Sequence, residues 1–284
     1  MGDAVPILLG LFSALTLAIA NVAVKRGGDI LMSRVGLSTT AAVLMAPAAF
    51  FVPLPTAEIW LALGFGLLAH FFYQSVMIRS LHRADLTLVF PIMRGLAPLL
   101  TAAGAFLLLD ERLSPVAVLG LVIATAAVMS FALPPRGSTF RRHPDRVALG
   151  YAFLTSVGVA LYTVADAAGV RAGADPFSYI VWLFMLDWVG VTAVAVVARR
   201  RTLFRDYAVQ LRHGTTGGVM AILSYGAALY ALSLAPAATI SALRETGIVF
   251  AAIIGWLFLK EGFGLRRTLA ACAVVAGLVL MQLG

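Results

Sequence analysis

Long apolar stretches, separated by short polar breaks, are the feature that most restricts the fold of this chain. Ten such stretches follow one another in 284 residues, and each is near the roughly 20 residues that a helix needs to cross a bilayer. Charged residues make up only 12% of the chain, against about 25% in a soluble domain. The sequence therefore excludes a soluble enzyme, a disordered chain and a nucleic-acid-binding domain, in spite of its net charge of +8.

The predicted fold is an all-α polytopic membrane protein with ten transmembrane helices. Turn-forming residues such as Gly27, Gly28, Pro53 and Pro55 separate the apolar stretches. The predicted spans are residues 4–24, 30–52, 58–78, 86–108, 115–133, 148–168, 177–198, 215–234, 237–259 and 265–283.

The basic residues predict how the chain is oriented in the membrane. Of 21 lysines and arginines, Arg94 and Arg244 fall inside spans and Arg112 and Arg171 fall in even-numbered loops, which leaves seventeen in the odd-numbered loops and their flanks. Loops on the cytoplasmic side carry the excess of basic residues. We therefore expect the odd-numbered loops in the cytoplasm and both termini on the opposite side, the periplasm of a bacterial inner membrane.

A basic linker, residues 134–147, divides five spans (residues 1–133) from five more (residues 148–284). Because each half has an odd number of spans, related halves would be inserted with opposite orientations. A shift of 150 residues aligns Arg94 with Arg244 and Glu111 with Glu261. Inverted repeats of this kind are typical of secondary transporters that alternate access around a central site.

An L-x-L-x-E pattern ends the fourth span of each half, and two further motifs lie in the second half. These segments are Leu107-Leu108-Leu109-Asp110-Glu111-Arg112, Tyr162-Thr163-Val164-Ala165-Asp166, Ala242-Leu243-Arg244-Glu245-Thr246 and Leu257-Phe258-Leu259-Lys260-Glu261. In these segments the sequence resembles the EamA-like transporters of the drug/metabolite transporter superfamily, and the resemblance covers nearly the whole chain. It implies two five-helix halves around a central cavity, and transport of small metabolites without ATP hydrolysis.

Arg94 and Arg244 are the leading candidates for substrate contact. An arginine in hydrocarbon costs at least about 2.5 kcal/mol, so both should face the interior of the bundle. Guanidinium suits carboxylate, phosphate and phosphonate because its planar fork donates two parallel hydrogen bonds. A structural ion pair with Glu245, Asp187 or a helix C-terminus is the competing interpretation.

Three acids are candidates for proton coupling: Glu245, Asp187 and Asp166. A carboxyl group in a medium of low dielectric can exchange a proton in the physiological range. For Asp187 a structural pairing with Arg94 or Arg244 is favoured. Asp166 ranks last, because near the end of its span its side chain should reach the headgroups.

Polar and aromatic side chains on several spans predict a mostly apolar cavity with a few polar groups. His70 and Gln74 share one face of the third span, and Tyr162 and Asp166 share one face of the sixth. The remaining candidates for substrate binding are Asn21, Tyr73, Trp182 and Tyr225.

The leading hypothesis is a secondary transporter, most simply an exporter, of an amino acid or a related carboxylate or phosphonate. The alternatives are an anion or sugar-phosphate exchanger, a cationic drug exporter and a lipid flippase. No enzymatic motif, metal site or cofactor site is found in the sequence. The expected partners are a small solute, the lipid bilayer and protons, with no nucleic acid, for a monomer or homodimer.

We predict that a reporter fused after Gly284 is active as alkaline phosphatase and dark as green fluorescent protein. The excess of basic residues in the odd-numbered loops is the reason. A fusion within the linker, after Pro134, serves as the control and should give the reverse pattern. A fluorescent fusion at Gly284 would show that the orientation is wrong, although not the ten-span fold.

Overall fold

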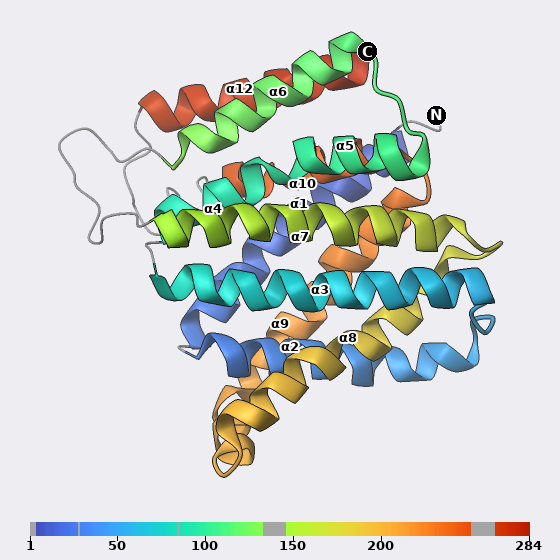
Figure 1. Cartoon of the computed structure of the whole chain (residues 1–284), viewed down its shortest axis with the longest axis vertical. Coiled ribbons are helices and arrows are strands. Elements are labelled where there is room, and N and C mark those ends of the chain that lie inside the picture. Colours follow the sequence, from blue (N-terminus) through green and yellow to red (C-terminus); the bar gives the residue numbers. More distant parts are fainter. Residues whose placement is uncertain (1–3, 28, 84–85, 133–145, 251–264) are drawn as a thin grey trace. The chain divides into compact units, whose positions relative to one another are not determined.

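The computed structural model describes residues 4–27, 29–83, 86–132, 146–250 and 265–284, and this part of the chain is helical (Figure 1). The helices are α1 (Ala4–Gly27), α2 (Ile30–Met45), η1 (Ala46–Phe50), α3 (Ala57–Arg83), α4 (Leu86–Gly95), α5 (Ala97–Leu109), α6 (Pro115–Ser130), α7 (Arg146–Arg171), α8 (Pro176–Arg199), α9 (Leu203–Leu232), α10 (Ala237–Arg244) and α12 (Leu265–Leu283).

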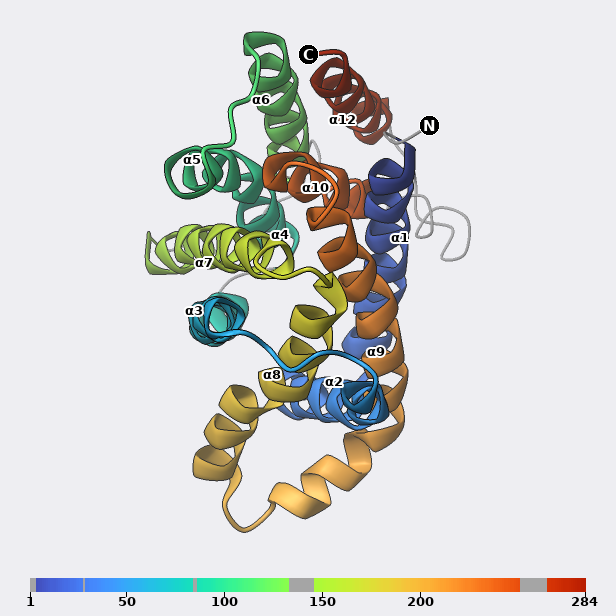
Figure 2. The ribbon, with the colours of Figure 1, turned by 90° about the vertical axis from the view of Figure 1, so that its right-hand side faces the viewer.

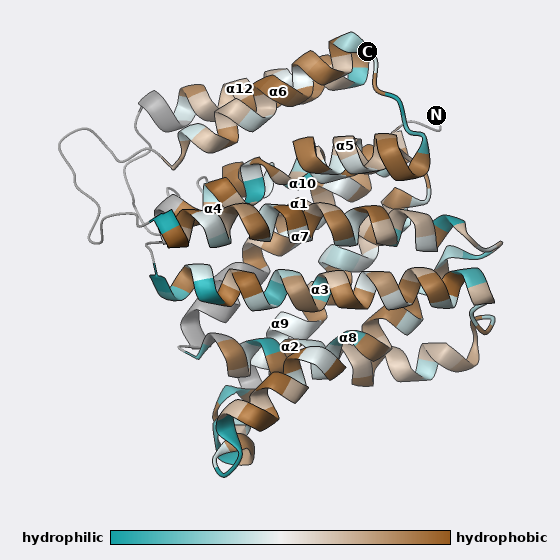
Figure 3. Ribbon diagram, in the orientation of Figure 1, coloured by the Kyte–Doolittle hydropathy of each residue, from teal (hydrophilic) through white to brown (hydrophobic). Residues whose placement is uncertain are grey.

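The helical polytopic membrane fold is confirmed. Hydrophobic residues cover most of the length of the helices, and the most hydrophilic residues gather near helix ends and loops (Figure 3). Among the described residues, 5 helical stretches are long and apolar enough to cross a bilayer, and α1, α6 and α12 contain shorter apolar stretches. The five are Ala57–Arg83, Val89–Leu109, Arg146–Arg171, Pro176–Arg199 and Gly214–Leu232.

Two predicted spans are broken at prolines. The span predicted over 30–52 ends as an α-helix at Met45 and continues as a 3₁₀ turn that contains Pro47. The span predicted over 86–108 is interrupted at Leu96, between α4 and α5. Pro98 has no N–H to donate to the carbonyl group of Arg94, so the regular helical ladder cannot pass through this point.

Helix α9 begins earlier than predicted, at Leu203 rather than at residue 215. Its apolar part, Gly214–Leu232, agrees with the predicted span. The first turns are polar but still helical, and the hydroxyl group of Thr202 donates to the Asp206 carboxylate over 2.8 Å at their start. Hydropathy locates the membrane-crossing part of a helix, whereas a polar extension into water leaves no apolar signal.

The described chain forms two compact units. Unit 1 comprises residues 1–71 and 165–234, and unit 2 comprises residues 72–164 and 235–284. Each unit combines segments from both sides of the basic linker, so the compact units differ from the two halves predicted from the sequence. The opposite orientation of these halves remains a prediction.

Close approach of glycines brings helices together in unit 1. A Cβ atom added to Gly36 of α2 would lie 3.0 Å from the Cα atom of Gly214 of α9. On α1, Ser13 accepts a hydrogen bond through its carbonyl oxygen from the hydroxyl group of Ser224 of α9, at 2.8 Å. Small residues and polar bridges of this kind hold helices together where apolar burial gives little driving force.

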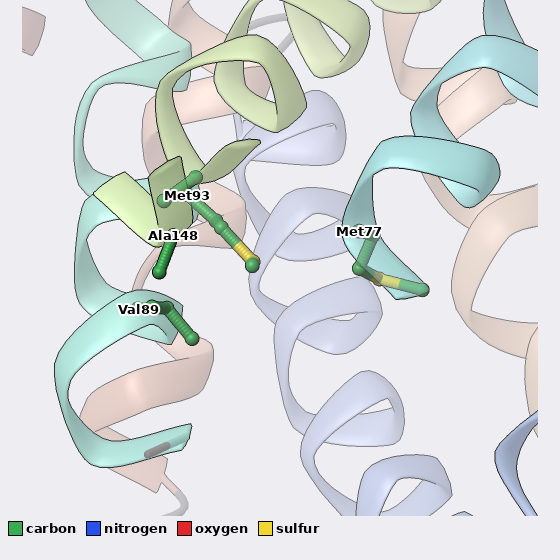
Figure 4. Packing of buried hydrophobic residues seen from close by; sticks show 5 residues of the cluster. Met77, Val89, Met93 and Ala148 are labelled. Carbon is green, nitrogen blue, oxygen red and sulfur yellow. The ribbon is translucent and has the colours of Figure 1, made fainter. Parts of the chain in front are cut away.

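Close approach of glycines also joins α6 to α12 in unit 2. The two helices lie side by side in both views (Figure 2). Helices α3, α4 and α7 contribute Met77, Val89, Met93 and Ala148 to one buried cluster of this unit (Figure 4). The apolar packing of these helices fixes the end of α4, where Arg94 lies.

We predict that Gly120→Ala lowers the melting temperature of the purified protein. A Cβ atom at residue 120 would lie 2.5 Å from the carbonyl oxygen of Gly277 and 2.6 Å from the amide nitrogen of Met281. Because both atoms belong to the backbone of α12, the helices must separate, at a cost of about 1–3 kcal/mol.

Gly150→Ala in α7 is the matched control, because nothing lies within 4 Å of its added Cβ atom. Alanine is a better helix former than glycine by about 1 kcal/mol, so this control should melt at the same or a higher temperature. Equal effects of the two substitutions would contradict the close packing of α6 and α12.

Candidate functional site

Unit 1 holds a buried carboxylate that is surrounded by donors from three other helices. Asp166 of α7 is 0% exposed. Its Oδ1 atom accepts a hydrogen bond of 2.6 Å from the hydroxyl group of Tyr179 of α8. Its Oδ2 atom accepts one from the hydroxyl group of Tyr225 of α9 and lies 3.3 Å from Nε2 of His70 of α3. We refer to Asp166, His70, Tyr179 and Tyr225 as the Asp166 cluster.

Glycines make the space for this cluster. A Cβ atom at Gly169 would lie 2.0 Å from the ring of Tyr179, and one at Gly66 would lie 2.7 Å from the hydroxyl oxygen of Tyr179. The tyrosine can therefore reach Asp166 only because both positions lack a side chain.

The expectation that Asp166 reaches the headgroups is wrong. Its side chain points into unit 1, where hydroxyl groups and an imidazole take the place of water around the carboxylate. A buried polar group is tolerated when its hydrogen bonds are satisfied in this way. His70 and Tyr225 were predicted site residues, whereas Tyr179 was not, because a tyrosine near the start of an apolar span reads as interfacial.

Unit 2 holds an ion pair between Arg94, near the end of α4, and Glu245, which follows α10. Nη2 of Arg94 lies 2.9 Å from Oε1 of Glu245, and Nε donates to Oε2 over 3.2 Å. Arg94 is 8% exposed and Glu245 is 5% exposed. The two nitrogens contact the two carboxylate oxygens, which is the fork geometry that a guanidinium favours.

Glu245 also lies within electrostatic reach of Arg244, which is 8% exposed. Two guanidinium groups therefore lie near one buried carboxylate, and one of them, that of Arg94, is hydrogen-bonded to it. Tyr73 and Tyr162 lie within electrostatic reach of Arg94, and their rings meet edge to face with centroids 5.3 Å apart. We refer to Arg94, Arg244 and Glu245 as the arginine triad.

A small cavity of about 10 Å³ lies beside the triad, at the break between α4 and α5. Gly95, Pro98, Thr125 and Glu245 are among its lining residues. The hydroxyl oxygen of Thr125 is buried and has no hydrogen-bond partner among the described residues. A cavity of this size has room for about one water molecule.

Glu111 has a structural role that sequence reasoning missed. Its carboxylate accepts a hydrogen bond of 2.8 Å from the backbone N–H of Ala237, the first residue of α10. A negative charge at this end stabilises a helix and satisfies one of its free N–H groups. The glutamate of the L-x-L-x-E pattern thus caps the helix that carries Arg244, while Glu261 lies outside the described residues.

The remaining predicted site residues are not all brought to these two places. Asp187 accepts a hydrogen bond of 2.9 Å from the hydroxyl group of Ser38 in unit 1. Trp182 packs edge to face on Trp60, with ring centroids 5.3 Å apart. Gln74 is buried in unit 2, and the side chain of Asn21 lies outside the described part of the structure.

Comparison with known proteins identifies related sequences and folds. The model of the EamA-like transporter family matches residues 2–133 and again residues 146–283, which confirms the resemblance drawn from the motifs. A solved structure described as "Crystal structure of protein" is 16% identical, covers 98% of this chain and 96% of that chain, and gives a TM-score of 0.73. At that identity the likeness shows the fold alone. No curated protein matches the sequence.

We predict that Tyr179→Phe lowers the free energy of unfolding by about 1–3 kcal/mol, because the Asp166 carboxylate loses a donor at a fully buried position. Tyr207→Phe is the matched control, since it removes a hydroxyl that bonds Thr39 at a partly buried site of the same unit. Thermal unfolding in detergent compares the two. An effect of Tyr179→Phe no larger than that of the control would contradict the assigned hydrogen bond.

Proposed function

We propose a substrate class and a direction of transport for this chain, which belongs to the EamA-like transporter family of membrane transporters for small solutes. The proposed solute is a small polar metabolite with a carboxylate or phosphonate group, such as an amino acid. The proposed direction is export, because a proton that moves inward down its gradient can be exchanged for a solute that leaves. The proposed location is a bacterial inner membrane with both termini in the periplasm.

The arginine triad is the observation that carries the substrate class. Its two guanidinium groups and its carboxylate are all buried. A guanidinium offers an anionic group of a bound solute two parallel hydrogen bonds. Two guanidinium groups beside a single carboxylate therefore favour an anionic solute.

The nearby aromatic rings support a small organic solute. Tyr73 and Tyr162 pair edge to face within electrostatic reach of Arg94. An apolar wall with a few placed polar groups is the usual form of a small-molecule site. A phosphate ester with two negative charges would need more cations than the triad supplies, so the sugar-phosphate exchanger is less favoured.

A cationic solute is the second candidate, and the observation that favours it is the buried carboxylate of Asp166. The arginine triad should affect the binding of a cationic solute and of an anionic solute in opposite directions. Two guanidinium groups beside one carboxylate would weaken the binding of a cation and strengthen that of an anion.

The test is a thermal-shift screen of the purified protein against amino acids, phosphonates, sugar phosphates and lipophilic cations. We expect stabilisation by carboxylates or phosphonates. Arg244→Met should abolish it, and Arg244→Lys should weaken binding by about 1.5–3 kcal/mol, because the charge remains but the planar fork is lost.

Arg79→Met is the control, since Arg79 is an exposed arginine that bonds a carbonyl group of its own helix. It should leave the stabilisation unchanged. Stabilisation by lipophilic cations alone would favour the second candidate. Undiminished carboxylate binding in a folded Arg244→Met protein would contradict the role of the triad.

A further inference from the structure

The two units neutralise a buried acid in two different ways. In unit 2, Glu245 is paired with Arg94, whose guanidinium keeps its proton at every physiological pH. In unit 1, Asp166 is contacted by His70, whose imidazole carries a charge only when it is protonated. The net charge of the Arg94–Glu245 pair is therefore fixed, whereas the net charge of the His70–Asp166 pair depends on one proton.

Among the residues that the structure describes, the groups that contact Asp166 carry no permanent positive charge. From α8 and α9 it receives the hydroxyl groups of Tyr179 and Tyr225, and from α3 the imidazole of His70. Arg171, one turn further along α7, donates from Nε to the carbonyl oxygen of Leu232 over 2.8 Å. The Asp166 cluster is therefore neutral with one proton shared by His70 and Asp166, and has a charge of −1 without it.

His70 is the less buried member of the His70–Asp166 pair. The side chain of His70 is 12% exposed, whereas that of Asp166 is fully buried. Tyr225 contacts both the imidazole and the carboxylate, and its ring stands edge to face on His70 with centroids 5.5 Å apart. The imidazole thus lies closer to the surface of unit 1 than the acid that it contacts.

We propose that the Asp166 cluster is the site that binds and releases the proton coupled to solute transport. This inference rests on the proposed function, which it extends by naming the residues that bind the coupled proton. One proton adds to the His70–Asp166 pair from water on one side of the membrane and returns to water on the other. Release leaves a buried carboxylate that accepts hydrogen bonds from the two tyrosine hydroxyls and has a neutral imidazole beside it, so the charge of the cluster distinguishes the two states.

The first experiment measures the protonation of His70 directly. The chain has 4 histidines, and changing His82, His143 and His213 to glutamine leaves His70 as the single imidazole. Nitrogen NMR of ¹⁵N-histidine-labelled protein in lipid nanodiscs separates the neutral from the protonated ring. We expect the ring of His70 to gain a proton when the buffer is changed from mildly alkaline to mildly acidic. An unchanged protonation state between these buffers would overturn the proposal and mark the cluster as a fixed structural network.

The second experiment measures coupling. Proteoliposomes that contain a pH-sensitive dye receive a mixture of the common L-amino acids outside. Wild-type vesicles should show a proton flux on addition, and Asp166→Asn vesicles should show at least a tenfold smaller flux while still binding the mixture in a thermal-shift assay. Ser224→Ala, a buried polar change without a titratable group in the same unit, should behave as wild type.

The two experiments separate the failure of this proposal from that of the proposed function. Binding of the mixture without any proton flux, or an equal flux with Asp166→Asn, would overturn the role of the cluster. If Asp166→Asn does not fold, Asp166→Glu keeps the carboxyl group and should restore a flux. A mixture that does not bind at all contradicts an amino acid as the solute, and the NMR titration then tests the role of the cluster by itself.

Discussion

The contact between Arg94 and Glu245 is the interaction on which the rest of unit 2 depends. A guanidinium and a carboxylate that are both more than nine-tenths buried are tolerated because each satisfies the other. The pair also fixes geometry, since Arg94 lies near the end of α4 and Glu245 directly after α10. The end of α4 and the end of α10 are therefore held together by this buried ion pair.

The places where the helices are broken also depend on burial inside the protein. Backbone that leaves the helical ladder inside a membrane must be buried in protein or line a polar space. The break at Leu96 and the turn at Glu245 both lie beside the small cavity that Thr125 and Glu245 line. On the other side of the α10 segment, Glu111 caps the N-terminus of the helix. The Arg94–Glu245 ion pair at one end of α10 and the capping carboxylate of Glu111 at the other thus fix both ends of this short helix, and the break before Pro98 lies beside it.

The helices and much of the site could be predicted from the sequence, because apolar length and intramembrane charge are strong local signals. Arg94, Arg244 and Glu245 stood out as charges within apolar spans, and the ion pair with Glu245 was one of the two interpretations. The burial of Asp166 could not be predicted, since it depends on Tyr179, Tyr225 and His70 from three other helices. The extra turns of α9 were missed because polar helix outside the bilayer resembles a loop in hydropathy.

The buried ion pair between Arg94 and Glu245 is the central claim, and a comparison of Glu245→Gln with the double variant Glu245→Gln, Arg94→Met tests it most directly. Removing Glu245 leaves the buried guanidinium of Arg94 without its carboxylate, so the single variant should be strongly destabilised, by about 3–5 kcal/mol. Removing Arg94 as well takes away this stranded positive charge. The melting temperature of the double variant in detergent should therefore be higher than that of Glu245→Gln alone. A double variant that melts at the same or a lower temperature would contradict the claim, because the two residues would then contribute independently.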